Sequence, residues 1–326
     1  MTSLSILIPT YNHALFLPKL LNSIISQLLS INKNIEVIIS DNASPDKTEE
    51  LCMEYNDKYD FVTYYRQEEN IGFENNVVTL LRKAKNEYVW IIGSDDWLED
   101  GAINYIFECL QSNTGISGLT MEINSYSKDE RPLVINGNFS QTIILNGMSE
   151  IYSYKKMGYR FGFISAHVFK RQLALYLLDK KLVNVNAHLI HSILTSMCNI
   201  WPTWIFIPYG LLAWRSENDN LAKRIGLYKR YLIDIDCYLN NIDKAVLQKD
   251  IRDEFVNNQL MYCVRGYIVS SAMNFLPSYS IRIDSLYRFW LYNKYWSIIF
   301  PISTMPNFII RILKKQYYLL KNLISN

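Results

Sequence analysis

Two neighbouring carboxylates, Asp95 and Asp96, follow an uncharged, β-prone run from Tyr88 to Ile92. The run predicts a buried strand that delivers the acids to an edge of a sheet. Because adjacent carboxylates repel each other, such a pair normally faces water or a cation. Carboxylate oxygens suit Mg²⁺ or Mn²⁺, and these cations suit a diphosphate. The alternative is a turn in which one of the acids caps the helix expected from about Asp100.

A second chemical feature is the pair His188 and His191, in a stretch without carboxylates. No acidic residue occurs between Asp179 and Glu217. The spacing of three places both histidines on one face of the helix predicted there. Histidine titrates near neutral pH and is a competent general base; a metal ligand, an acceptor contact and a hydrogen-bonded core histidine are the alternatives. We place His191 ahead of His188 as the base, with Asp179 next in line.

Arg215 opens a polar segment after a strand predicted at Trp204–Ile207. A guanidinium in this place suits a phosphate contact, and a surface salt bridge with Glu217 or Asp219 is the alternative. The 23 uncharged residues from 192 to 214 contain two prolines. They are predicted to form a helix end and a buried strand, not a membrane span.

The elements that must position these residues alternate between strand and helix. Strands are predicted at 4–8, 35–40, 61–65 and 88–92, and helices at about 15–28, 47–59 and 73–85. A further helix is expected at 101–113, a strand at 119–123, and a buried strand that enters a helix at 162–171. This alternation predicts an α/β fold with a parallel, doubly wound sheet, whose ligands bind beyond the carboxyl ends of the strands.

Four of these segments together resemble a known family. They are the opening Ser5–Asn12, the strand and loop Glu36–Ser44, the turn Asn70–Gly72 and the edge Gly93–Asp96. The chain resembles the family 2 glycosyltransferases of GT-A fold, and within them the sugar transferases of O-antigen and capsule gene clusters, including abequosyltransferase-like enzymes. The resemblance implies inverting transfer of a sugar from a pyrimidine nucleotide-diphosphate donor to a saccharide, lipid-linked acceptor.

The resemblance also implies a set of site residues. Contacts to the nucleotide-sugar donor fall on Pro9, Thr10, Tyr11, Asp41, Asn70, Gly72, Ser94, Asp95 and Arg215. Asp41 would accept a hydrogen bond from the base, or it is an Asx-turn residue. Asp95 and Asp96 would hold Mn²⁺ or Mg²⁺, which neutralises the leaving diphosphate. Ser165 would lie beside the donor sugar.

The chain departs from the family pattern at two places. Gly93 stands where the family often has the first acid of its metal edge, and Glu74-Asn75-Asn76 stands where it often has an Arg-Asn pair. Metal and diphosphate contacts therefore rest on fewer groups, and a non-catalytic binding module on a degenerate GT-A fold is an alternative. A sugar nucleotidyltransferase is a further one, but the loop Pro9–Asn12 lacks the glycine-rich, basic character expected of it.

Charge is distributed unevenly along the chain. The last 42 residues contain no acid and six basic residues, Arg288, Lys294, Arg311, Lys314, Lys315 and Lys321. Without these six charges the net charge of +2 becomes about −4 for residues 1–284. We therefore expect a catalytic domain at 1–220, a helical extension at 221–284 and a basic, aromatic, amphipathic tail at 285–326. The small net charge argues against nucleic acid as a partner.

The tail predicts an interfacial helix on anionic lipid, and packing on the protein's own core or on a second subunit is the alternative. The five cysteines are scattered, as is typical of a reducing compartment. The apolar run Leu4–Ile8 is too short for a signal peptide. We expect a cytoplasmic protein that is peripheral on the inner face of the cell membrane.

Overall fold

The computed structural model describes residues 2–136, 141–147, 150–151, 162–183, 185, 188–216, 231, 234–240, 249–256, 264, 266–270, 290 and 295–324. The chain forms two compact units, Met1–Asn218 with Asn241–Val246, and Asp219–Asn240 with Leu247–Asn326. Most of the helical extension predicted at 221–284 lies outside the described residues, as do Glu217 and Asp219. The division into three segments stays a prediction.

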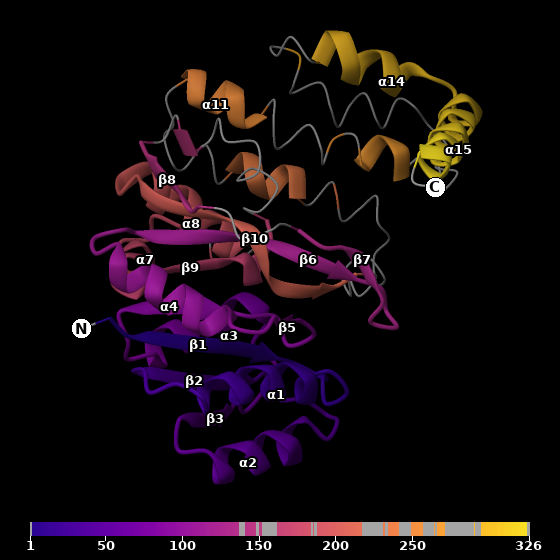
Figure 1. Ribbon diagram of the computed structural model, residues 1–326. Coiled ribbons are helices and arrows are strands. Elements are labelled where there is room, and N and C mark those ends of the chain that lie inside the picture. The colour runs from indigo at the N-terminus through magenta and orange to yellow at the C-terminus, as the bar shows by residue number, and fades with distance from the viewer. Residues whose placement is uncertain are drawn as a thin grey trace. The chain divides into compact units, whose positions relative to one another are not determined.

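The first half of the sheet follows the apolar runs of the sequence. Its strands are β1 (Leu4–Thr10), β2 (Ile35–Asp41), β3 (Val62–Arg66) and β4 (Tyr88–Ile91). All four are parallel, in the order β3-β2-β1-β4. Figure 1 shows β3, β2 and β1 side by side in this order. Every residue of β1 and β4 is buried, because helices cover both faces of a parallel sheet. The four predicted strands are confirmed, and their carboxyl ends share one edge.

The second half of the sheet is mixed, which the prediction of a parallel sheet missed. The order continues from β4 through β9 (His167–Lys170), β6 (Gly118–Tyr126) and β10 (Thr203–Arg215) to β5 (Trp97–Leu98). β9 runs antiparallel to both β4 and β6, and β10 runs parallel to β6. The short strands β7 (Pro132–Val134) and β8 (Ile143–Asn146) pair with β6 and β10. Because β6 and β10 are again parallel to β4, β10 delivers Arg215 to the same edge.

The helices of the first unit are α1 (Leu17–Leu28), α2 (Thr48–Lys58), α3 (Phe73–Lys83), α4 (Ala102–Ser112), α7 (Arg171–Asp179) and α8 (Leu189–Ile200). α3 packs on β1 and β2, and α1 packs on β5 and α4. Leu15 was expected in the apolar stripe of α1, but it precedes the helix and is 83% exposed. Pro18 in the first turn sets the start of α1, since a proline favours that position.

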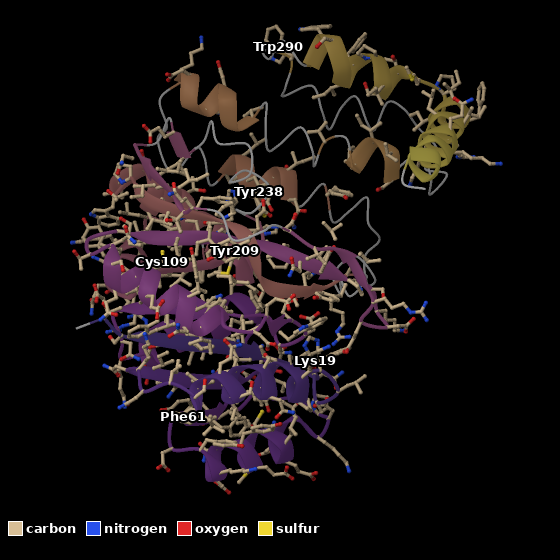
Figure 2. All side chains as sticks on the ribbon, in the orientation of Figure 1. Lys19, Phe61, Cys109, Tyr209, Tyr238 and Trp290 are labelled. Atoms are coloured by element: carbon tan, nitrogen blue, oxygen red, sulfur yellow. The ribbon has the colours of Figure 1, made fainter. Side chains whose placement is uncertain are left out.

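Most of the described residues of the second unit are helical, with Trp290, Met305 and Pro306 as exceptions. It contains α11 (Lys249–Phe255), a π-turn at Tyr295–Ile299, α14 (Phe300–Thr304) and α15 (Asn307–Ile324). Trp290 and Trp296 are each more than half exposed. Trp290 is labelled in Figure 2. Among the described residues, none of the helices combines the length and the apolar character that a membrane crossing requires.

Candidate functional site

The edge that follows β4 brings two carboxylates together above a glycine. A Cβ atom placed on Gly93 would lie 3.2 Å from Asp96 Oδ2, 3.3 Å from Asp95 Oδ1 and 3.4 Å from Ser165 Oγ. The carboxylates and the hydroxyl therefore converge on one small space. An aspartate at position 93 would put its own side chain into that space, so glycine keeps it open.

Asp96 is buried without a full set of partners. Ser165 Oγ donates a 2.7 Å hydrogen bond to its Oδ2, and the Gly93 amide donates to Ser165 Oγ at 2.9 Å. Its Oδ1 is buried and has no hydrogen-bond partner in the described part of the chain. Burial, followed by the charge of Asp95, raises the pKa of Asp96 to about 8. A cation at this point would favour the ionised carboxylate and would take up the unsatisfied oxygen.

A histidine that the sequence analysis did not single out lies at the same edge. His13 Nδ1 is 2.6 Å from Ser94 Oγ, and the charges of Asp95 and Asp46 act on its ring. Burial nevertheless lowers the pKa of His13 below its usual value. The signal was available, because His13 directly follows the loop Pro9–Asn12 that was assigned to the donor.

Arg215 ends β10 beside the carboxylates. Its Nε donates to the backbone carbonyl of Asp95 at 3.3 Å, and its Nη2 pairs with Glu130 Oε1 at 2.8 Å. The guanidinium lies 5.2 Å from the ring centroid of Phe16 and 5.1 Å from that of Trp97. Arg215 therefore holds the acidic edge in place. Its ion-pair partner Glu130 comes from the turn after β6, which sequence spacing did not indicate.

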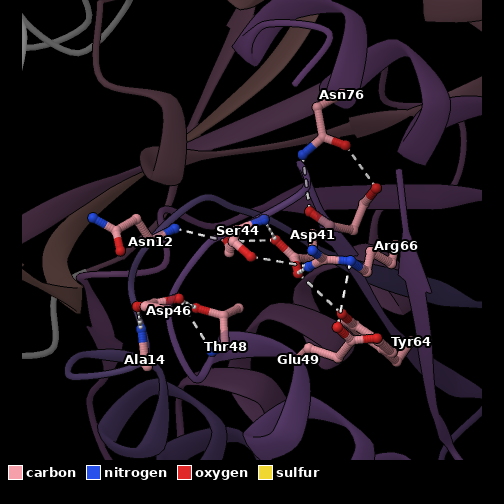
Figure 3. Close-up of polar contacts among 11 residues, drawn as sticks. Asn12, Ala14, Asp41, Ser44, Asp46, Thr48, Glu49, Tyr64, Arg66 and Asn76 are labelled. Atoms are coloured by element: carbon pink, nitrogen blue, oxygen red, sulfur yellow. Dashed lines mark hydrogen bonds and ion pairs between the residues drawn. The ribbon is translucent and has the colours of Figure 1, made fainter. Parts of the chain in front are cut away.

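The loop after β2 is organised by a saturated carboxylate. Asp41 is 0% exposed, and its Oδ2 accepts hydrogen bonds from Tyr64 at 3.0 Å and Arg66 at 2.8 Å (Figure 3). Its Oδ1 accepts from the amide of Ser44 at 3.0 Å and from the Ser44 hydroxyl. Ser44 Oγ in turn accepts from the Asn12 amide at 2.8 Å, so Asp41 links the loops after β1 and β2. A nucleotide base would have to replace one of these partners to contact Asp41 directly.

The turn Asn70–Gly72 is tied to the same loop. Asn42 Nδ2 donates to Asn70 Oδ1 at 2.9 Å, and Asn42 Oδ1 accepts from the Ile71 amide at 2.9 Å. Gly72 has φ +81°, a conformation that glycine adopts without steric cost. Hydrogen bonds thus link the loops that follow β1, β2, β3 and β4.

This arrangement agrees with the comparisons with known proteins. A profile of glycosyl transferase family 2 matches residues 5–178, which is more than half of the chain. The chain belongs to glycosyltransferase family 2. It is 30% identical to the abequosyltransferase RfbV of Salmonella typhimurium over 254 residues, which are 72% of this chain and 73% of that protein.

Solved structures agree on the fold of this family 2 glycosyltransferase. TarS 1–349 of S. aureus, in complex with UDP-GlcNAc, superposes with a TM-score of 0.65 and 16% identity, covering 88% of this chain and 80% of that one. The mannosyltransferase PcManGT of Pyrobaculum calidifontis, in complex with GDP-Man and Mn²⁺, gives 0.60 at 14% identity, with 96% and 87% covered. The fold is GT-A, as the sequence predicted.

Of the residues expected under the base, the transferase exposes one. Pro9 and Thr10 belong to β1 and are buried, because the strand runs two residues beyond the predicted end. Tyr11 is 45% exposed. Tyr11 is therefore the one of the three whose side chain is accessible to a nucleotide, and the contacts of Pro9, Thr10 and Tyr11 with the donor stay a prediction.

The two histidines do not share a helix face. His188 precedes α8 as its N-cap, with φ +50°, whereas His191 lies inside the helix. His188 is half-buried, but His191 is 2% exposed. Burial, with smaller effects from His188 and His167, lowers the pKa of His191 well below its usual value. The expectation of a shared helix face was therefore wrong. A general base must reach the acceptor hydroxyl, so the burial of His191 favours His188, and the identity of the base stays a prediction.

The residues present fit a divalent cation that is shared with a ligand. Within the described ranges, no group of three or more histidine, cysteine or acidic side chains gathers to hold a metal by itself. Asp95 and Asp96 supply two carboxylates that converge, and Asp96 Oδ1 is unsatisfied. Mg²⁺ and Mn²⁺ commonly bind one or two carboxylates together with phosphate oxygens and water. Asp95 and Asp96 are thus suited to a cation that arrives with a diphosphate.

Proposed function

We propose that this protein is an inverting glycosyltransferase that moves a sugar from a pyrimidine nucleotide-diphosphate donor to a saccharide of a cell-surface polysaccharide. The observation that carries the proposal is the convergence of Asp95, Asp96 and Ser165 on the space above Gly93. The ligands named for the TarS and PcManGT structures, UDP-GlcNAc and GDP-Man with Mn²⁺, support a nucleotide-sugar donor and a divalent cation. The likeness to RfbV supports an O-antigen or related polysaccharide.

In this mechanism Asp95 and Asp96 would hold Mn²⁺ or Mg²⁺ together with the donor. When bound, the cation supplies Lewis-acid stabilisation of the leaving nucleoside diphosphate. Arg215 keeps the backbone of Asp95 in place, and Ser165 orients Asp96. Asp41 holds the loop that presents Tyr11 and Asn12 to the base, through Ser44.

The acceptor side uses His188. A ring nitrogen of His188 takes the proton of the acceptor hydroxyl as that oxygen bonds to the anomeric carbon, and the bond from this carbon to the diphosphate oxygen breaks. Attack from the face opposite the diphosphate inverts the anomeric centre. His188 suits this role better than His191, because it is half-buried at the start of α8 and not enclosed within the helix.

Release of a nucleoside diphosphate tests the reaction. A panel of UDP-, CDP-, dTDP- and GDP-sugars is offered with and without Mn²⁺, and at least one pyrimidine donor should be consumed only with the metal. His188→Ala should lower turnover by about two to four orders of magnitude with donor affinity retained. Binding of a donor without any release, across acceptors, would favour the non-catalytic alternative. A benign His188→Ala in an active enzyme would place the base elsewhere.

The basic tail is proposed to seat the enzyme on an anionic membrane surface, where a lipid-linked acceptor would be met. In α15, Phe308, Ile312 and Leu313 are at least half exposed, and Arg311, Lys314 and Lys315 lie within the same two turns. Exposed apolar side chains beside lysines and arginines are typical of an interfacial helix. Each basic residue near such a surface contributes about 1 kcal/mol.

Flotation with vesicles tests this placement. The full chain should float with vesicles that contain anionic lipid at low salt, and it should be released at high salt. Phe308→Ser with Ile312→Ser should abolish flotation without loss of transfer to a soluble acceptor. A full chain that stays in solution at low salt, or a double variant that still floats, would overturn the membrane placement.

A further inference from the structure

The structure brings a carboxylate to the segment that lacks one in sequence. Although no acidic residue occurs between Asp179 and Glu217, Glu74 of α3 reaches the start of α8. Its Oε2 accepts a hydrogen bond from the Leu189 amide at 3.3 Å, and its charge interacts with that of His188. Glu74 and His188 are 114 positions apart in the sequence, so only folding brings this carboxylate to the start of α8.

The pair lies at the edge of the sheet that carries the site. Glu74 is in the first turn of α3, which follows the turn Asn70–Gly72. Asn76, in the same turn, accepts a 2.6 Å hydrogen bond from Ser40 near the carboxyl end of β2 and donates to its carbonyl at 2.8 Å. The first turn of α3 is therefore fixed to the edge where parallel strands bind their ligands.

Both members of the pair are half-buried, so they are partly desolvated and still accessible. Burial raises the pKa of Glu74, while the charge of His188 and the amides of Leu189 and His188 oppose that rise. In the described part of the chain, the groups that act on this region include the amides of His188 and Leu189, which donate to Glu74, and the rings of His188 and His167, whose charges act on His191 one turn further along α8.

We propose that Glu74 is the positioning carboxylate of the general base: it orients the His188 ring and stabilises the imidazolium that forms when His188 takes the acceptor proton. This inference rests on the proposed role of His188. A base that is oriented by a third group is a recurring arrangement in enzymes, in which the carboxylate holds the ring and compensates its positive charge. Here α3 supplies that carboxylate from a distant part of the chain.

A purely structural role for Glu74 is the competing explanation, because a carboxylate that accepts from Leu189 also caps α8. Glu74→Gln separates the two. Glutamine keeps an oxygen that can accept from the amide, but it has no negative charge. The matched control is Glu108→Gln, an exposed helical residue of α4 that is remote from the proposed site.

The first measurement is the pKa of His188 itself, followed by NMR of the ring protons. The chain has four histidines, and a His188→Ala spectrum assigns the signal. Glu74→Gln should lower the pKa of His188, because an ionised carboxylate favours the imidazolium. Glu108→Gln should leave it unchanged. An unchanged His188 pKa in Glu74→Gln would overturn the pairing whether or not the enzyme transfers a sugar.

The second measurement is kinetic. Glu74→Gln should lower kcat about ten- to a hundredfold, shift the acidic limb of the kcat/KM profile to lower pH, and leave donor affinity and Tm unchanged. In a His188→Ala background, Glu74→Gln should lower kcat no further, since the effects of substituting two residues that act as a unit are not additive. Wild-type kcat in Glu74→Gln, or equal losses in both backgrounds, would reduce Glu74 to a helix cap. A benign His188→Ala would instead overturn the proposed base, which leaves the metal site at Asp96 untouched.

Discussion

Two buried aspartates end strands on either side of β1, and they differ in what satisfies them. Asp41 ends β2, and its two oxygens accept bonds from Ser44, Tyr64 and Arg66. Asp96, just past β4, is 5% exposed and leaves Oδ1 without a partner in the described part of the chain. A buried carboxylate needs compensation, which the protein supplies at Asp41 and leaves incomplete at Asp96. Incomplete satisfaction, more than burial, therefore distinguishes a site for a ligand from a structural position.

The largest expected effect is at Asp96. Asp96→Asn should reduce transfer by about three orders of magnitude or more, because it removes an anionic ligand worth several kcal/mol of charge stabilisation. The variant should fold normally, since it relieves the repulsion with Asp95. Nucleoside diphosphate release at saturating Mn²⁺ and thermal unfolding measure the two effects.

The control for this variant is Asp57→Asn, an exposed residue of α2. It should leave both activity and Tm unchanged. Substantial activity in Asp96→Asn, or a loss of stability like the one expected at Asp41, would remove the distinction between the two aspartates.

Substitution of Asp41 should mainly lower the stability of the protein, whereas substitution of Asp96 should mainly lower its activity. Asp41→Ala leaves the Arg66 guanidinium and the Tyr64 and Ser44 hydroxyls without their acceptor, which should cost about 2–4 kcal/mol of unfolding free energy. The estimate lies below that of a fully buried ion pair, because the Arg66 side chain is 33% exposed. Urea unfolding measures it. Tyr64→Phe removes one of the four bonds and should cost about 1 kcal/mol.

Two results would contradict the structural role of Asp41. One is an Asp41→Ala protein as stable as Tyr64→Phe. The other is a stable Asp41→Asn protein that has lost discrimination between pyrimidine donors, which would restore Asp41 as a direct contact to the base.

The smallest expected effect is at Ser165, which donates a hydrogen bond to only one of the two carboxylate oxygens of Asp96. Ser165→Ala removes the 2.7 Å bond to Asp96 Oδ2 and the acceptor of the Gly93 amide. Losing one hydrogen bond to a charged group costs about 1.5–3 kcal/mol, which corresponds to roughly a ten- to hundredfold loss of kcat/KM. The apparent Mn²⁺ affinity should fall in parallel. Ser26→Ala, on the exposed side of α1, is the matched control.

A Ser165→Ala enzyme with unchanged Mn²⁺ affinity and kcat/KM would show that Asp96 is positioned by the β4 backbone alone. The convergence above Gly93 would then need no help from the turn Ile164–Ala166 that precedes β9. That outcome would sharpen the comparison, since Asp96 would depend on even fewer partners than Asp41.

The first half of the fold was predictable because its signals are local. Four apolar runs of strand length, each followed by polar turn formers and an amphipathic helix, specify parallel strands and the edge at which their loops meet. The second half was less so: β9 is a short strand whose direction depends on its neighbours β4 and β6. A strand of four residues carries no local signal for the direction in which it pairs.

The site residues divide in the same way. Asp95, Asp96 and the turn Asn70–Gly72 follow strands in sequence, so their place at the edge could be predicted. The end of β1 was harder to predict from the sequence. The strand was expected to end before Pro9, but it continues to Thr10, which is buried and pairs with Asp41 of β2. His13 carried a usable signal in its position after Asn12, and the analysis passed over it.

The sequence by itself predicted the first strands of an α/β sheet and the acidic edge, because these depend on hydrophobic period and on residues adjacent in the chain. The family and the GT-A fold came from the resemblance of its four motifs to family 2 glycosyltransferases. The tertiary structure alone decided which carboxylate is satisfied and which is not, since Asp41 is saturated by Tyr64 and Arg66 from β3 while Asp96 meets Ser165 from the segment before β9. It also decided that Glu74 meets Leu189 at the start of α8 across 115 positions. Such contacts join segments whose pairing is fixed by packing of the sheet and its helices, and no local pattern encodes them.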